Sequence, residues 1–372
     1  PFMSRSSTKR IRQAAVAAVL LAAGCGAPSP TGAGGVGEVA EAHQSLAATG
    51  ESLFRQETFG GNGRTCETCH GMATGTVNPA ELRALYQRNP DAPMFRAIDS
   101  DDGTTGSSYR RLLDHATVLV SIPLPSNTRL LLDPGATQLT LRRGIPSTLD
   151  TPALDPVLMQ DGRAPSLTVQ AHDAIMGHAQ ATREPTAQEL ASIASFEQTL
   201  FSSQAMKDYA STGVAPSLPE GNTESEKRGR AFFRPEGACG QCHAGPLLNE
   251  TGPRNILGQP PGSRFSNAFV SEINFIANPV YILVVQRPPL GLPEVRLSPD
   301  PGRFLITGRL EDFNHFKMSS LWNIKNTAPY FHDNSAETLE DVLTHYTFAL
   351  APSGILLSPR DAQDIIAWLK LL

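Results

Sequence analysis

The sequence predicts a mainly α-helical protein of two similar domains, with a small β-hairpin inserted in the second domain. A Cys-x-x-Cys-His segment occurs twice, beginning at Cys66 and at Cys239. Residues 50–55 and 229–234 precede these segments as a weak internal repeat, each with two apolar residues on one predicted helix face. An amphipathic helix also closes each half of the chain. Two copies of one helical unit explain all three observations.

Start signals and apolar spacing predict the two closing helices. In the first half, Thr186 and Glu189 have the spacing of a capping box, and the apolar positions that follow are Leu190, Ile193, Phe196 and Leu200. In the second half, Ser358 and Pro359 begin a helix whose apolar positions are Ile365, Ile366, Trp368, Leu369 and Leu372. The predicted divisions are a first domain at 46–205, a linker at 206–222 and a second domain at 223–372.

Two short runs in the second domain predict strands. Residues 280–285 and 303–307 are apolar or β-branched, and proline or glycine bounds each of them. We expect these runs to pair as a hairpin within the helical second domain.

The first residues of the chain resemble an export signal. Basic residues precede an apolar run at 14–23 that is too short to span a bilayer, and Cys25 follows a small-residue cleavage pattern. We predict a signal peptide at 1–24 and a lipid on Cys25, as in bacterial lipoproteins; an ordinary signal peptide cut nearby is the alternative. Residues 25–45 are then expected to form a flexible tether.

The overall charge excludes some classes of partner. A net charge of −5 and a pI of about 6.0 predict no basic surface for nucleic acid or anionic lipid. No second apolar run approaches the ~20 residues of a membrane-spanning helix. We therefore expect membrane attachment only through the N-terminal lipid.

The repeated Cys-x-x-Cys-His pattern is the one that attaches c-type haem. Its residues are Cys66, Cys69 and His70, then Cys239, Cys242 and His243. The thiols bond to the haem vinyl groups, and the histidine becomes the proximal ligand of the iron. A thioredoxin-like pair needs a βαβ context that is missing here, and a four-cysteine zinc site needs no histidine after each pair. We therefore predict two cytochrome c-like domains, each with one covalent haem.

The order of motifs resembles the bacterial di-haem cytochrome c peroxidases and their relatives of the MauG type, the methylamine-utilisation maturation enzymes. The resemblance covers residues 46–372. Besides the two haem motifs, it rests on Arg143-Gly144-Ile145-Pro146-Ser147, Asp161-Gly162-Arg163-Ala164, Gln170, Thr327-Ala328-Pro329-Tyr330-Phe331-His332 and Leu339. It implies a peroxidatic first haem and a six-coordinate electron-transfer haem in the second domain.

The resemblance also implies a sixth ligand for the second haem, fourteen residues after His332. That position holds methionine in the peroxidases and tyrosine in the MauG type, and here it is Tyr346. Because a phenolate favours oxidised iron, tyrosine ligation would lower the potential of this haem. The alternative is that Tyr346 is a core aromatic residue and that His345 or Met318 is the ligand.

The expected distal pocket of the first haem departs from the family pattern. Gln170 matches a glutamine of that pocket, but Gln180 stands where the peroxidases have an acid–base glutamate. An amide cannot transfer a proton, so Glu184 or His178 is the expected substitute. We therefore expect Gln170, His178 and Gln180 at the catalytic site.

Two further family features are missing. No histidine follows His70 at the usual distal position, so the first haem is expected to be open, or to be bound by His172 or His178. Gln160 also stands where the family has a tryptophan between the haems. Trp322 is the candidate alternative electron relay, although a packing role is the favoured interpretation.

The resemblance implies one calcium ion between the domains. The family binds it partly through the backbone carbonyls that match Thr327 and Pro329, which suits a hard cation. The remaining ligand has no match that the sequence identifies.

These expectations define four alternative functions. The favoured one is a periplasmic, MauG-like oxidoreductase that reduces hydrogen peroxide at the first haem and draws electrons from a protein substrate through the second. A conventional peroxidase would draw them from a small cytochrome or cupredoxin. The others are a non-enzymatic electron carrier and an oxygen-using enzyme like the rubber-cleaving di-haem dioxygenases.

Overall fold

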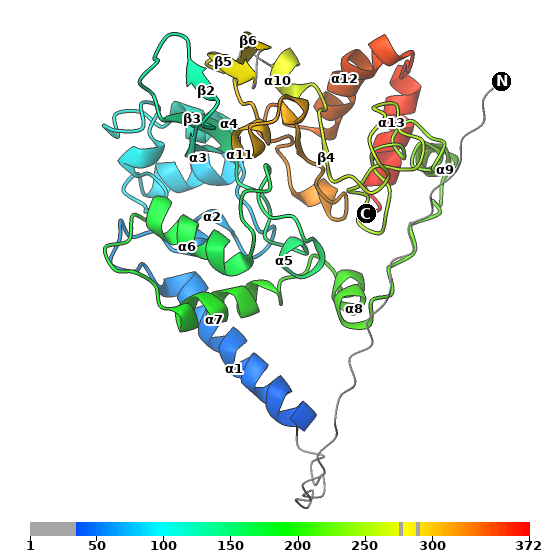
Figure 1. Cartoon of the computed structure of the whole chain (residues 1–372). Helices are drawn as coiled ribbons and strands as arrows, with labels where there is room; N and C mark the ends of the chain where they lie inside the picture. The colour runs from blue at the N-terminus through cyan, green and yellow to red at the C-terminus, as the bar shows by residue number, and fades with distance from the viewer. Residues whose placement is uncertain (1–34, 275–277, 288–290) are drawn as a thin grey trace, which may run out of the picture. The chain divides into compact units, whose positions relative to one another are not determined.

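The computed structural model describes residues 35–274, 278–287 and 291–372, and it is mainly helical with small sheets (Figure 1). The chain divides into two units, Pro1–Glu41 and Ala42–Leu372. All residues of the two Cys-x-x-Cys-His segments lie in the second unit. The predicted signal peptide and Cys25 lie outside the described residues.

The helices are short and are spread along the whole described chain. Helix α1 begins at Gly35, so residues 35–45 are helical although a flexible tether was expected there; this segment is rich in the good helix formers Ala, Glu and Gln. The helices are α1 (Gly35–Gln56), α2 (Cys66–Cys69), α3 (Pro79–Arg88), α4 (Arg110–His115), α5 (Thr151–Leu154), α6 (Leu167–Gly177), α7 (Ala187–Glu197), α8 (Gln204–Thr212), α9 (Glu224–Ala231), α10 (Val270–Ile273), α11 (Phe304–Thr307), α12 (Leu339–Leu350) and α13 (Pro359–Leu369).

Both predicted closing helices are confirmed, together with their start signals. Helix α7 begins after Thr186, whose hydroxyl accepts a hydrogen bond from the Glu189 backbone while Glu189 accepts one from the Thr186 backbone. Helix α13 begins after Ser358 with a capping box to Asp361. Each box satisfies backbone N–H groups that the first turn leaves without a partner.

The same helix crossing occurs in both halves of the chain. A Cβ added to Gly50 of α1 would lie 2.8 Å from the Cβ of Phe196 on α7, and one added to Gly229 of α9 would lie 2.9 Å from the Cβ of Trp368 on α13. Only glycine allows two helix backbones to approach this closely. The internal repeat therefore has a structural counterpart, whereas the predicted domain divisions stay a prediction.

The strands form three small antiparallel sheets. They are β1 (Thr117–Pro123) with β3 (Gln138–Gly144); β2 (Thr128–Leu130), β5 (Tyr281–Arg287) and β6 (Gly291–Ser298) in the order β2-β5-β6; and β4 (Phe265–Ser266) with β7 (Phe316–Lys317). Strands β1 and β3 were not among the predicted elements. Their signal was alternation, because Val118, Val120 and Ile122 are buried on one face.

The predicted hairpin is correct in its first strand and wrong in its second. The partner of β5 is β6, and residues 303–307 instead contain the helical turn α11, which the amide of Gly308 closes on the carbonyl of Phe304 at 2.8 Å. Apolar periodicity cannot distinguish helix from strand over so few residues. Strand β5 also pairs with β2, so this sheet joins segments from the two predicted domains.

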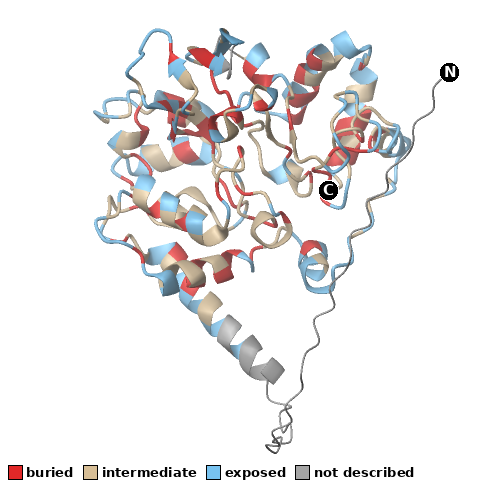
Figure 2. Ribbon diagram, in the orientation of Figure 1, coloured by how far each residue is buried: buried red, intermediate tan, exposed pale blue. Residues whose placement is uncertain are grey.

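Three clusters of buried apolar side chains form the core. Figure 2 colours the buried residues red along the ribbon. One cluster draws only on residues before 201 and centres on Phe54 and Phe196. Another draws only on residues after 232 and centres on Trp368, which is fully buried as expected. The third contains the β1–β3 pair and also Leu283, Val285 and Phe304. Among the described residues, no helix has both the length and the apolar character that crossing a bilayer requires.

Candidate haem sites

The first Cys-x-x-Cys-His segment is a helical turn with its histidine held in one orientation. Thr65 caps α2 and exchanges hydrogen bonds with Thr68. His70 Nδ1 lies 2.8 Å from the carbonyl oxygen of Gly75, so a proton on Nδ1 leaves Nε2 free as an iron ligand. Burial lowers the pKa of His70, which keeps the ring neutral as a ligand must be.

The second segment repeats this geometry. His243 Nδ1 lies 2.8 Å from the carbonyl oxygen of Leu248, so its Nε2 is likewise free. Burial raises the pKa of Cys69 to about 11 and that of Cys239 to about 12. Burial thus favours the neutral form of these thiols.

A cavity of about 840 Å³ opens beside Cys66, Cys69 and His70. Its volume is in the range of small-molecule and cofactor sites, which is about 300–1,000 Å³. The apolar part of its lining includes Val118, Val120, Ile145, Met159 and Ile175. Two thiols, one oriented imidazole and an apolar wall are the donor set and surroundings that a c-type haem requires. The residues present therefore fit this cofactor.

The structure separates the predicted distal residues into two groups. Gln170 and His178, at the two ends of α6, both line the cavity. Gln180 is exposed, does not line it, and accepts a hydrogen bond from Asn62 at 3.0 Å. His178 is therefore the titratable residue of this segment that was expected at the site and does line the cavity.

His172 and Glu184 pair with each other away from the cavity. His172 Nε2 lies 2.7 Å from a Glu184 carboxylate oxygen, and His172 Nδ1 lies 3.1 Å from Asp173. Hydrogen bonds to Asp173 and Glu184 raise the pKa of His172. The nitrogen atoms of this histidine are thus engaged at the surface, so His178 is the better distal candidate.

One cavity residue escaped sequence analysis. Glu197, at the end of α7, lines the cavity with only 4 % of its surface exposed, and its Oε2 has no hydrogen-bond partner. Burial raises the pKa of this carboxyl to about 8. A signal was available in the internal repeat, because Glu197 follows Phe196 as the apolar Leu369 follows Trp368.

Tyr346 lies beside the second pair of thiols. It is on α12, and its pKa is raised first by burial and then by the proximity of Cys242 and Cys239. The neighbouring His345 has Nε2 2.7 Å from the carbonyl oxygen of Ala268. That hydrogen bond directs His345 away from ligation. Tyr346 and Cys239 both pack against the apolar cluster around Trp368.

Curated proteins with similar sequences are cytochrome c peroxidases. No family model matches the chain. It is 28% identical over 195 residues to cytochrome-c peroxidase IdrP1 of Pseudomonas sp. (strain SCT), covering 48% of each chain, and 28% identical over 180 residues to cytochrome c551 peroxidase of Nitrosomonas europaea, covering 48% of this chain and 42% of that one. The chain thus spans about half the length of these curated relatives.

The fold has a counterpart among solved structures. A MauG-like protein associated with microbial copper homeostasis superposes with a TM-score of 0.50 at 20% identity, over 88% of each chain. In sequence the chain is therefore similar to cytochrome c peroxidases, and in fold to this MauG-like protein. Similarity to cytochrome c peroxidases is consistent with c-type haems at the two Cys-x-x-Cys-His segments.

An amide occupies the place where the family has a tryptophan between its haems. Gln160 lines the first cavity, and its Nε2 donates to the carbonyl oxygen of Gly144 at 3.3 Å. Its own carbonyl accepts from the Lys317 amide at 2.7 Å, so backbone from the second half lies directly against it. The indole of Trp322 donates to the carbonyl oxygen of Pro246 at 2.9 Å and packs in the cluster around Trp368.

Buried charges connect the two halves next to the first cavity. Arg143 lines the cavity and donates two hydrogen bonds to Asp300, at 2.7 and 2.9 Å, and a third to Asp161. These three residues are at most 3 % exposed. The guanidinium holds the pKa of Asp161 below its usual range despite burial. The charges are therefore paired, as buried charges must be.

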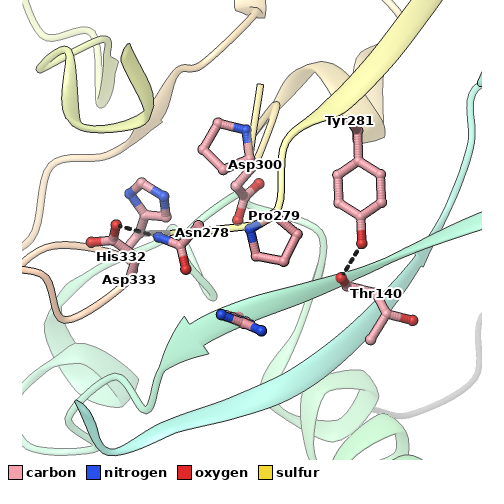
Figure 3. A pocket seen from close by; sticks show the side chains of 9 residues that line it. Thr140, Asn278, Pro279, Tyr281, Asp300, His332 and Asp333 are labelled. Carbon is pink, nitrogen blue, oxygen red and sulfur yellow. Dashed lines mark hydrogen bonds between the residues drawn. The ribbon is translucent and has the colours of Figure 1, made fainter. Parts of the chain in front are cut away.

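A much smaller pocket lies behind this network (Figure 3). Its volume is about 20 Å³, which is room for about one water molecule. In Figure 3, Asn278 donates to Asp333 and Tyr281 donates to the carbonyl oxygen of Thr140. His332, which also lines it, stacks on Phe316 with the ring centroids 3.6 Å apart. This pocket is too small for a cofactor.

The expected calcium ligands lie close together in the loop before His332. Thr327 follows a helical turn at Ile324–Asn326, and the Ala328–Pro329 peptide bond is cis. Among the described residues, no three His, Cys, Asp or Glu side chains are grouped to hold a metal ion. Calcium binding by the carbonyls of Thr327 and Pro329 therefore stays a prediction.

Proposed function

We propose that this protein is a di-haem c-type oxidoreductase that reduces hydrogen peroxide at the first haem with electrons passed through the second. The observation that carries the proposal is the open cavity beside Cys66, Cys69 and His70, with His178 and Gln170 on its wall. Such a cavity leaves room for a small oxidant next to an oriented proximal histidine. The peroxidase names of the curated relatives support the same reaction.

The residues of the first site have separate roles in this proposal. His70 and the two thiols hold the haem, which supplies the redox chemistry when bound. Gln170 orients the oxidant by hydrogen bonding. His178 is neutral at pH 7 because burial lowers its pKa, so it can take a proton from the incoming peroxide and return it to the leaving oxygen. The overall reaction consumes one peroxide, two electrons and two protons, and it yields two water molecules.

We further propose the MauG-like variant, in which the electrons come from a protein substrate. Its support is the position of Tyr346 beside Cys239 and Cys242. A tyrosine ligand stabilises oxidised iron and makes the second site a poor acceptor for ordinary high-potential donors. The names of the curated relatives favour the second candidate, a conventional peroxidase supplied by a small cytochrome or cupredoxin.

The proposal places the protein in the periplasm. Covalent attachment of haem outside the cytoplasmic membrane and the export signal at 1–24 both support this location. A lipid on Cys25 would hold the protein at the membrane surface. One calcium ion bound through Thr327 and Pro329 is part of the same proposal.

Haem content provides the first test. A pyridine haemochrome assay on the purified protein should find two haems per chain, and Cys66→Ala or Cys239→Ala should each weaken attachment at one site only. The ferric spectrum before and after hydrogen peroxide should then show a high-spin component that responds to the oxidant. One haem or none would refute the di-haem proposal, and two low-spin haems that ignore peroxide would favour an electron carrier.

A further inference from the structure

A buried carboxyl at the edge of the first haem cavity has no evident role in the proposed reaction. Glu197 is 4 % exposed, lines the cavity near Cys66, and has an oxygen without a hydrogen-bond partner. Leaving a buried carboxyl oxygen unpaired costs roughly 1–3 kcal/mol or more. Such a cost persists in a protein when the group has a function.

The other half of the chain shows that folding does not require this carboxyl. Gly50 approaches Phe196 as Gly229 approaches Trp368, so the residues after these aromatics occupy matching places. Those residues are Glu197 and Leu369, and both are 4 % exposed. Leu369 packs in the apolar core of its half at no electrostatic cost. The carboxyl is therefore specific to the first cavity.

We propose that Glu197 is the proton-coupling group of the first haem. Its carboxylate takes up one proton from solvent water when that haem gains one electron from a one-electron donor, and it releases the proton when the electron leaves. No bond forms between Glu197 and the haem. The inference rests on the proposed function only in requiring a haem at Cys66, Cys69 and His70.

The physical basis is the low dielectric constant of the cavity. Burial alone raises the pKa of Glu197 to about 8, far above the ordinary value for glutamate of about 4.3. An added electron on a haem in the same cavity makes a nearby negative carboxylate still less favourable. Uptake of the electron and of the proton therefore reinforce each other, and the potential of the haem should fall as pH rises.

Other charged groups face the cavity, and most of them are already paired. Arg64 pairs with Asp99 at 2.6 Å, and Arg143 and Arg163 pair with Asp161. The remaining charged or titratable side chains on the wall are Glu57, Asp102, Asp173 and His178, apart from the haem-binding residues themselves. Within the described part of the chain, the buried carboxyl oxygen that lacks a partner belongs to Glu197.

The test compares three variants of the full holoprotein. Glu197→Gln keeps the shape of the side chain and removes its titratable proton. Glu197→Leu introduces leucine, the residue type that Leu369 provides at the matching position in the second half. Glu57→Gln is the control, because Glu57 lines the same cavity but accepts a hydrogen bond from the Phe59 amide at 2.6 Å. The midpoint potential of the first haem is measured by spectroelectrochemistry between about pH 5 and pH 9, after haem content has been verified.

In the wild-type protein the potential should be constant below about pH 8, where Glu197 is protonated in both oxidation states. Above that pH it should fall, by up to about 59 mV for each tenfold drop in proton concentration. Glu197→Gln and Glu197→Leu should flatten that slope, and Glu57→Gln should keep it. An infrared difference spectrum of the wild-type protein at about pH 9, where Glu197 is ionised before reduction, should also show a protonated carboxyl band that appears on reduction.

Three outcomes would overturn the inference. A slope that survives in Glu197→Gln refutes it while leaving the di-haem proposal intact. If neither variant attaches haem, the infrared spectrum of the wild-type protein decides, and no carboxyl band on reduction refutes it. Absence of haem at the first site removes the proposed function and this inference together.

Discussion

At the scale of single residues, the two haem sites differ in the side chains that complete them. The first site has His178 and Glu197 on an open cavity, whereas the second has Tyr346 packed beside its thiols. Matching attachment motifs are thus surrounded by different chemistry. The individual side chains, rather than the repeated scaffold, are therefore expected to set the reactivity of each haem.

Tyr346 provides the test of the MauG-like proposal. We expect Tyr346→Met to raise the potential of the second haem, because a thioether favours reduced iron more than a phenolate does. Tyr346→Phe should open a coordination position and convert that haem towards high spin. Potentiometry and the ferric visible spectrum check both outcomes, with Tyr330→Phe as the control because its hydroxyl donates to the carbonyl oxygen of Ile324. An unchanged low-spin spectrum in Tyr346→Phe would mean that another residue is the ligand.

His178 provides the test of the distal site. The first haem is expected to be at least partly high-spin at rest, so His178→Ala should leave its spin state unchanged. Loss of this acid–base group should slow the reaction with peroxide by roughly 10²–10⁴-fold. Stopped-flow mixing with hydrogen peroxide measures the rate, and Gln180→Ala, outside the cavity, should react at the wild-type rate. A change from low to high spin in His178→Ala would instead identify His178 as an iron ligand.

The buried carboxyl of Glu197 predicts a specific dependence of stability on pH. The pKa of Glu197 is about 8 in the folded protein and about 4.3 in the unfolded chain. Between these two pH values the carboxyl is protonated in the folded state and ionised in the unfolded state. The free energy of unfolding contributed by this group is therefore highest in acid and is lost as pH rises from about 4.3 towards 8. Relative to the wild type, Glu197→Gln should therefore increase the free energy of unfolding more at pH 8 than at pH 5. Denaturant titrations at the two pH values check the sign.

At the scale of elements, the two glycine crossings position the helices that frame each haem site. Gly229→Ala would place a Cβ 2.9 Å from that of Trp368, so α9 and α13 would have to separate. We expect a loss of about 1–3 kcal/mol in the free energy of unfolding, as for other overpacked core positions. Gly135→Ala is the matched control, since its nearest neighbouring atom lies at 3.9 Å. Equal melting temperatures for the two variants would contradict the crossing.

At the scale of the whole molecule, buried ion pairs and a shared sheet connect the halves that carry the two sites. Asp300→Asn would leave Arg143 with one carboxylate partner in a buried place. We expect it to lower the free energy of unfolding by several kcal/mol and to broaden the thermal transition, because breaking a buried pair costs about 3–5 kcal/mol. Calorimetry measures both effects. Lys227→Ala, which breaks an exposed pair with Glu224, should change little.

Local sequence was enough to predict the Cys-x-x-Cys-His segments, the capped closing helices and the similarity to cytochrome c peroxidases. Each depends on residues that are neighbours in the chain: a pentapeptide, a capping box, or the spacing from His332 to Tyr346. Only the tertiary structure decided which distal residues reach the cavity, because the turn after α6 directs His178 inward and leaves Gln180 exposed. The same holds for the partner of β5 and for Glu197, whose burial depends on helices distant in sequence. Chain neighbours fix local geometry, whereas burial and long-range pairing arise from contacts that no short segment contains.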